Sequence, residues 1–141
     1  YVTDFPDDTL LDVPGVIAIP HLGASTEESE DNCAHMAAAQ LAEYLLNGNI
    51  KNSVNYPEAI LPRTTAHRIT IMHRNVTNMV GQMTAVLAES GQNIADMINK
   101  SRGELAYTII DTDHDVTPEE TERLLAIDGV IRVRSLGRVE M

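Results

Sequence analysis

The spacing of apolar residues predicts four strands in the second half of the chain. Residues 68–73 alternate isoleucine with polar neighbours, as a strand with one buried face does. Residues 93–101 and 104–111 are two further strand-like runs, and the two residues between them end in glycine, which suits a hairpin turn. Residues 130–136 form a final run of the same kind. We expect four short strands here.

Two helices are predicted between these strands. Apolar residues recur at helical spacing over residues 79–87, and Gly91 supplies the stop. A second helix is predicted after Thr117, where Pro118 occupies the first helical position and Glu120 completes a capping box. The order of elements is βαββαβ. This order predicts an α+β, ferredoxin-like domain with a four-stranded antiparallel sheet and both helices on one face.

The first part of the chain predicts less structure. Residues 16–19 are a short apolar run that indicates a buried strand. A long helix is predicted over residues 27–47, with Ser25 or Thr26 as its cap and Gly48 as its end. One strand and one helix cannot enclose a core, so we expect this segment to be marginal by itself.

Charge and composition divide the chain near Pro57. Residues 1–60 hold ten acidic residues and one basic residue, Lys51, whereas the remainder is nearly balanced. The stretch around Pro57 collects Gly, Pro, Asn and Thr, which break regular structure. The predicted organisation is therefore a first segment over residues 1–51, a linker over residues 52–66 and a domain over residues 67–141.

The overall charge and composition exclude several classes of function. The formal net charge of -11 would repel nucleic acids and anionic membranes, so we expect neither as a partner. No apolar run is long enough to span a membrane, and the single Cys33 fits a reducing compartment, so we expect a cytoplasmic protein. Because the chain starts at Tyr1, we expect it to be a piece of something longer.

Common sequence motifs for metals and phosphates are missing. Cys33 and His35 lie two apart on a predicted helix with no second pair nearby, so we expect no metal site. Neither GxGxxG nor GxxxxGK[ST] occurs. The single Phe5 lies outside the βαββαβ segment, which argues against an RNA-binding sheet.

The string PHLGAST at residues 20–26 is the first constellation that indicates function. His21 lies between the end of a predicted strand and the start of a helix, where open α/β sheets bind ligands. An isolated histidine there is more often structural, but the whole string is much more specific. It resembles the signature of the D-2-hydroxyacid dehydrogenase family. The string at residues 30–57 extends the resemblance over nearly the whole chain and narrows it to one activity within the family.

This resemblance implies a catalytic role for His21. In the family, this histidine exchanges a proton with the substrate hydroxyl while hydride moves to or from NAD. The resemblance also implies a carboxylate that holds the imidazolium, for which Asp8 is favoured and Asp7 is the alternative. The expected cofactor-binding residues are Asp4, His21, Leu22, Gly23 and Ala24. The family's dinucleotide fingerprint and its substrate-binding arginine have no counterpart in this sequence, so the segment would come from a Rossmann-type domain that cannot catalyse alone.

His73, Asn75 and Asn93 form the second constellation. They lie at or near predicted strand ends, where we expect them to converge beside a helix amino terminus, a corner that suits a zwitterionic amino acid. The alternative is that the asparagines only form turns. The segment resembles an ACT domain, and these three residues match the L-serine contacts of members that bind that amino acid.

The ACT resemblance also implies partners. ACT domains pair side by side with their ligand pockets at the seam, so we expect self-association and an L-serine-like effector. One departure is Thr77-Asn78, which replaces the usual Pro-Gly turn. Two alternatives remain open: a different D-2-hydroxyacid dehydrogenase activity, or an ACT domain that serves only for dimerisation.

Overall fold

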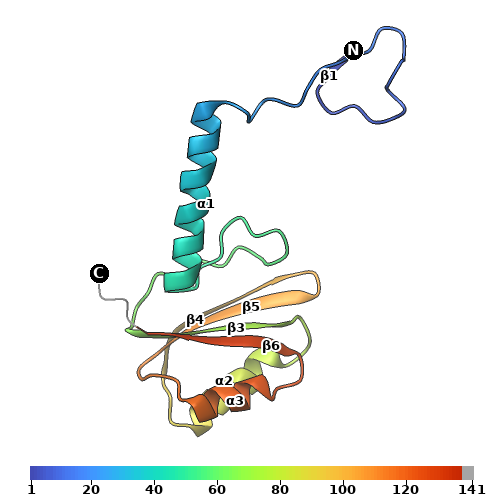
Figure 1. The fold of residues 1–141 in the computed structure, drawn as a ribbon. Helices are drawn as coiled ribbons and strands as arrows, with labels where there is room; N and C mark the ends of the chain where they lie inside the picture. The colour runs from blue at the N-terminus through green and yellow to red at the C-terminus, as the bar shows by residue number, and fades with distance from the viewer. Residues whose placement is uncertain (138–141) are drawn as a thin grey trace. The chain divides into compact units, whose positions relative to one another are not determined.

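The computed structural model describes residues 1–137 and divides the chain into two compact units. The first unit is Tyr1–Ala39, and the second begins at Gln40. Figure 1 shows the elements of both units along the chain. Among the described residues, no helix combines the length and the hydrophobicity that crossing a lipid bilayer requires.

The first unit contains a small parallel ladder. Strand β1 (Val2–Thr3) pairs with β2 (Ile17–Ala18), and the amino group of Tyr1 donates to the carbonyl of Gly15 at 2.9 Å. The prediction of a buried strand here is wrong, because Ile17 is 60% exposed. Two strands alone offer no second layer to cover either face.

Helix α1 (Glu27–Asn47) has the predicted bounds. Its cap is Thr26, whose Oγ1 accepts from the amide of Ser29 at 3.2 Å, so the second of the two predicted caps is confirmed. The helix ends at Gly48, which adopts a φ of 72°. A Cβ at Gly48 would lie 2.5 Å from the Cγ2 of Thr70, so both the turn and the close approach to the sheet require glycine.

The second unit has the predicted βαββαβ order, and the α+β class is confirmed. The sheet order is β4-β5-β3-β6 with antiparallel neighbours, and Figure 1 shows both short helices on one face. The capping box of Thr117 and Glu120 is present. The elements are β3 (His67–Arg74), α2 (Met79–Glu89), β4 (Ile94–Arg102), β5 (Leu105–Thr112), α3 (Pro118–Leu125) and β6 (Val130–Leu136).

Each face of the sheet has its own hydrophobic core. The helix-side core is made by side chains of β3, β5, α2 and α3 and by the loop residue before α3, namely Ile69, Ile71, Met79, Met83, Leu87, Ile110, Val116 and Leu124. The opposite core joins Tyr107 and Ile109 of β5 to Ile50, Ala59 and Leu61. Ala59 and Leu61 lie in the segment expected to be a linker. That segment has little regular structure, but it packs on the sheet.

A buried ion pair holds residues 52–66, here called the covering segment, against the sheet. Arg68 and Asp111 have fully buried side chains, and their Nε and Oδ1 atoms are 2.6 Å apart. Arg68 Nη1 donates to the carbonyl of Asn47 at 2.9 Å, and Asp111 Oδ2 accepts from the amide and hydroxyl of Thr64. Burial opposes ionisation of Asp111, but the hydrogen bonds from Arg68 and Thr64 outweigh it and lower the pKa of the carboxyl. The pair thus joins the end of α1, the covering segment and two strands.

Replacing Asp111 with asparagine should destabilise the second unit by about 3–5 kcal/mol, because Arg68 would remain as a buried charge without its counter-ion. Urea unfolding measures this loss. Glu89→Gln is the matched control, since it breaks the exposed pair with Arg123 and should cost at most about 1 kcal/mol. Equal losses in the two variants would contradict the role of the buried pair.

The same variant should change the acid sensitivity of the fold. The pKa of Asp111 is lower in the folded chain than its ordinary value of 3.8, so its ionisation stabilises the fold above that pH, and the stabilisation disappears as the pH falls through the folded pKa. Asp111→Asn should therefore lose less stability on acidification below pH ~4 than the wild-type chain does.

Candidate functional site

The parallel ladder of the first unit brings His21 and Asp4 together. Asp4 follows β1 directly and His21 follows β2 by three residues, so both lie at the carboxyl end of the strands, where open α/β sheets bind ligands. The Nδ1 atom of His21 lies 3.3 Å from Oδ2 of Asp4. The ring of Phe5 meets the imidazole edge to face at 5.5 Å. The carboxylate lies on the Nδ1 side of the ring, and the His21 side chain is 61% exposed.

The carboxylate expected to pair with His21 is not the one that the structure provides. Among the interactions of residues 1–137, Asp8 makes no bond to His21. Asp7 accepts three hydrogen bonds from Thr9 and Leu10, which form a turn and lower its pKa. Asp4, which was expected to contact the cofactor, is the carboxylate beside the imidazole, because it is the residue that leaves the paired strand.

The loop after His21 is open. Leu22, Gly23 and Ala24 are exposed, and the amide of Ser25 donates to the carbonyl of Leu22 at 3.0 Å, which fixes the turn. A Cβ built on Gly23 would meet nothing within 4 Å. A flat ring could approach this backbone beside His21 without steric conflict. The exposed loop leaves room for a ligand beside His21, and the sequence contains neither of the two phosphate-cradling glycine patterns.

His73, Asn75 and Asn93 do not converge within one chain. Asn75 adjoins the turn between β4 and β5, where its Nδ2 donates to the carbonyl of Gly103 at 3.1 Å. Asn93 precedes β4 at the other end of the sheet, where its amide donates to Oδ1 of Asp113 at 3.0 Å. The expectation of a single corner is wrong for one chain.

The strand register explains this separation. Arg74 pairs with Leu105 at one end of β3, and His67 pairs with Thr112 at the other. Ile94, which follows Asn93, also pairs with Thr112. At ~3.3 Å per residue, the seven steps from His67 to Arg74 span about 23 Å. Asn93 is therefore out of reach of Asn75 unless another chain contributes it.

His73 is buried and already has hydrogen-bond partners. Its side chain faces the helix-side layer, its Nδ1 lies 2.8 Å from the carbonyl of Arg74, and its Nε2 lies 2.9 Å from Oγ1 of Thr108. Oδ1 of Asn99 is 2.9 Å from the same hydroxyl. Thr108 and Asn99 were not among the residues predicted for the site. The signal for them was two polar residues at helix-facing positions of adjacent strands.

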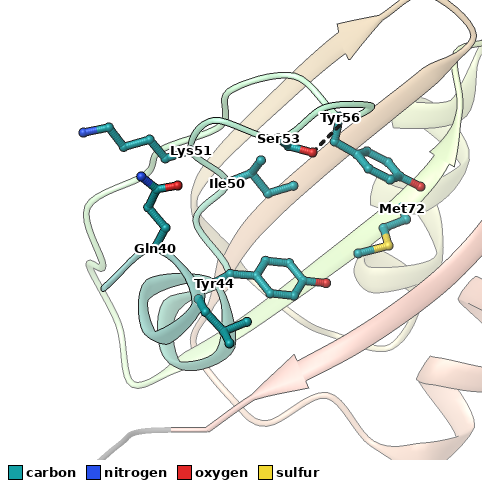
Figure 2. Close-up of a pocket in the computed structure, with 8 residues that line it drawn as sticks. Gln40, Tyr44, Ile50, Lys51, Ser53, Tyr56 and Met72 are labelled. Carbon is teal, nitrogen blue, oxygen red and sulfur yellow. Dashed lines mark hydrogen bonds between the residues drawn. The ribbon is translucent and has the colours of Figure 1, made fainter. Parts of the chain in front are cut away.

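A cavity of about 360 Å³ lies on the sheet face opposite α2 and α3. Figure 2 shows Tyr44 and Tyr56 pointing the same way with Met72 beside them, while Lys51 extends away from the two rings. Cζ of Arg134 lies 4.5 Å from the Tyr44 ring centroid, and the ring centroids of Tyr107 and Tyr56 are 6.2 Å apart in an edge-to-face arrangement. The cavity could take a small apolar group, and it contains none of the predicted site residues.

Among the residues that the structure describes, no group of three or more His, Cys, Asp or Glu side chains could hold a metal ion.

Sequence comparison supplies relatives for most of the chain. It is 33% identical over 129 residues to the D-3-phosphoglycerate dehydrogenase of Escherichia coli (strain K12), a match that covers 90% of this chain and 32% of that protein. The D-3-phosphoglycerate dehydrogenase of Haemophilus influenzae is 32% identical over 129 residues, with 90% and 31% covered. The string at residues 30–57 predicted this resemblance, which is confirmed. The chain spans about a third of the length of these relatives.

No protein-family model matches the chain. The ACT domain of the GTP pyrophosphokinase of Chlorobium tepidum is a structural neighbour with 19% identity and a TM-score of 0.43, covering 53% of this chain and 89% of that one.

Proposed function

We propose that this chain is the regulatory, carboxy-terminal part of an NAD-dependent D-3-phosphoglycerate dehydrogenase. The observation that carries the proposal is the match to such enzymes, which is 33% identical and covers 90% of the chain. In this role the parent enzyme would convert 3-phosphoglycerate to 3-phosphohydroxypyruvate, the first step of L-serine biosynthesis. The second unit would act as an ACT domain that senses an amino acid, L-serine.

His21 would be the proton-transfer group of the parent enzyme. Asp4 lies beside Nδ1, so Nε2 is the atom that would take the proton of the substrate hydroxyl. NAD, when bound, would accept the hydride, and its nicotinamide end would lie against the open loop at Gly23. The phosphate-binding and substrate-carboxylate groups would come from the remainder of the parent protein.

The effector site would be completed by a second copy of the chain. Strand β4 is an edge strand of the sheet, so a partner's β4 can pair with it. If the two strands run antiparallel about a two-fold axis at Ile98, Asn93 of one chain lies opposite Gly103 of the other. Gly103 is the residue whose carbonyl already accepts from Asn75. The separation of Asn75 and Asn93 within one chain would thereby disappear.

The charges on β4 support the same register. With Ile98 on the axis, Asp96 of each chain lies opposite Lys100 of the other, and opposite charges at facing positions stabilise antiparallel strands. Asp96, Ile98 and Lys100 are spaced two positions apart, so their side chains share one face of the strand. The edge is therefore complementary to a copy of itself.

The two asparagines have the chemistry that an amino acid requires. Asn75 uses its Nδ2 to bond Gly103, which leaves Oδ1 to accept from an ammonium group. Asn93 is exposed, and its side-chain amide can donate to a carboxylate. An effector held between the two chains would stabilise their pairing, and a coupling of about 1–3 kcal/mol would suffice to change turnover of the parent enzyme.

The 141-residue chain should not oxidise 3-phosphoglycerate with NAD, because it contains no phosphate-cradling loop for the dinucleotide. Absorbance at 340 nm tests this at high protein concentration. Turnover by the purified chain that is lost in His21→Asn would contradict the division of labour proposed here. A full-length parent that prefers another D-2-hydroxy acid in a substrate panel would contradict the assigned substrate.

L-serine binding should show complementation between two variants. Asn75→Ala and Asn93→Ala should each lose binding by themselves. A mixed dimer retains one intact site, which combines Asn75 of one chain with Asn93 of the other, so calorimetry on an equimolar mixture should recover part of the heat. The wild-type chain should bind about one serine per chain. Binding that survives in both variants, or an ACT unit that pairs without binding serine, would favour the alternative of a dimerisation module.

Self-association should depend on the pairing of Asp96 with Lys100. Asp96→Lys should weaken the dimer, because two lysines would then face each other across the seam. The double variant Asp96→Lys, Lys100→Asp should restore it. Analytical ultracentrifugation measures both, and Glu104→Lys outside the paired strand is the control. A double variant as weak as the single one would contradict the Ile98-centred register.

A further inference from the structure

The cavity on the sheet face opposite α2 and α3 has the size of a ligand site. Its volume of about 360 Å³ lies at the lower end of the range for small-molecule pockets, so it has room for a ligand of one or two rings. All of its lining residues belong to the second unit. Asn75 and Asn93, the proposed effector contacts, are not among them. The cavity is therefore a separate site from the one proposed for the effector.

The walls of the cavity suit an aromatic ring. Tyr44 and Tyr56 point the same way, and Met72 lies beside their rings (Figure 2). Leu41 and Ile50 add to the apolar lining. Aromatic rings attract one another edge to face or offset, and a methionine thioether contacts ring edges and adapts to their shape. A planar aromatic body is therefore the kind of ligand that these walls favour.

The loop that carries Tyr56 is fixed at its base and again further along. At the base, Ile50 and Ala59 exchange two backbone hydrogen bonds of 2.8 and 3.0 Å. Nη1 of Arg102 donates to the carbonyl of Ser53 at 3.1 Å, and Oγ of Ser53 accepts from the amide of Tyr56 at 3.2 Å. A ligand meets a wall that is already ordered, which lowers the entropic cost of binding.

The charge around the cavity favours an anion. Lys51 is the only basic residue among residues 1–60, which hold ten acidic residues, yet it lines a cavity that no acidic residue lines. It belongs to none of the ion pairs found within residues 1–137. The Arg134 guanidinium, which packs on the Tyr44 ring, belongs to none of them either and donates to backbone carbonyls of α1. Two cations without a carboxylate partner thus lie around the cavity.

We propose that this cavity binds a small aromatic carboxylate. The ring of the ligand lies against Tyr44, Tyr56 and Met72, and its carboxylate faces solvent at the mouth, where the Lys51 ammonium donates to it. Lys51 is exposed and points away from the two rings in Figure 2, and its flexible four-carbon chain lets the ammonium turn towards a ligand. The proposal does not depend on the parent enzyme or on L-serine, because the cavity shares no residue with either proposed site.

NMR of the 141-residue chain with ¹³C-labelled methionine methyl groups tests the site, with 2-naphthoate as the probe. The Met72 methyl resonance should move and saturate with a dissociation constant below about 1 mM. The methyl groups of Met79 and Met83 lie in the core on the other face of the sheet and should not move. A Met72 resonance that stays fixed at millimolar 2-naphthoate, or equal movement of all three methyl groups, would overturn the site.

Variants at Lys51 test the class of ligand. Lys51→Gln should weaken binding of 2-naphthoate about fivefold and leave binding of the neutral 2-naphthamide unchanged, whereas Lys51→Arg should retain both. These variants change an exposed side chain, so they should fold. Arg123→Gln is the matched control, because it removes a positive charge from α3 on the other face and should bind both probes as the wild-type chain does. Equal affinity of the wild-type chain for the acid and the amide, or an unchanged affinity for 2-naphthoate in Lys51→Gln, would overturn the assignment of an anionic ligand.

Discussion

The second unit depends on the buried ion pair between Arg68 and Asp111. Both charges are removed from water, which is costly unless every polar atom finds a partner. Arg68 has donors for Asp111, for the carbonyl of Asn47 and for the side chain of Asn49, while Asp111 also accepts from Thr64. The guanidinium of Arg68 also lies at the carboxyl end of α1, where its positive charge compensates the partial negative charge of the last carbonyls. One pair thus fixes a helix end and the covering segment to the sheet.

The elements of this unit were predictable because their signals are local. Apolar spacing predicted α2, and the Thr117–Glu120 capping box predicted the start of α3, within one or two residues. The covering segment was not predictable in the same way. Ala59 and Leu61 lie among helix breakers, so they resemble a linker until the sheet offers them a surface. The sequence signals were two charged residues next to apolar strand residues, Arg68 and Asp111. Neither residue by itself indicates that the other is its partner.

The candidate sites show a similar limit. The PHLGAST string located His21, but only the parallel pairing of β1 with β2 determines that Asp4 is the carboxylate beside it. The expectation that His73 and Asn75 lie close together was safe, because residues two positions apart in a chain are always near each other. Asn93 is twenty positions further on, and its place follows from the register of β4. A resemblance can name the residues of a site, but it does not place them, and one chain holds Asn75 and Asn93 at opposite ends of the sheet.

The two edges of the sheet differ in their suitability for pairing with a copy of themselves. Strand β6 carries Arg132 and Arg134, so any two-fold antiparallel pairing centred near Val133 would bring arginines face to face. Arg134 is also engaged with Tyr44 and the end of α1. Strand β4 places Asp96 and Lys100 symmetrically about Ile98, so the same kind of pairing on this edge would bring opposite charges face to face. The charge pattern therefore discourages one edge and favours the other, and the favoured edge is the one that carries Asn93 and Asn99.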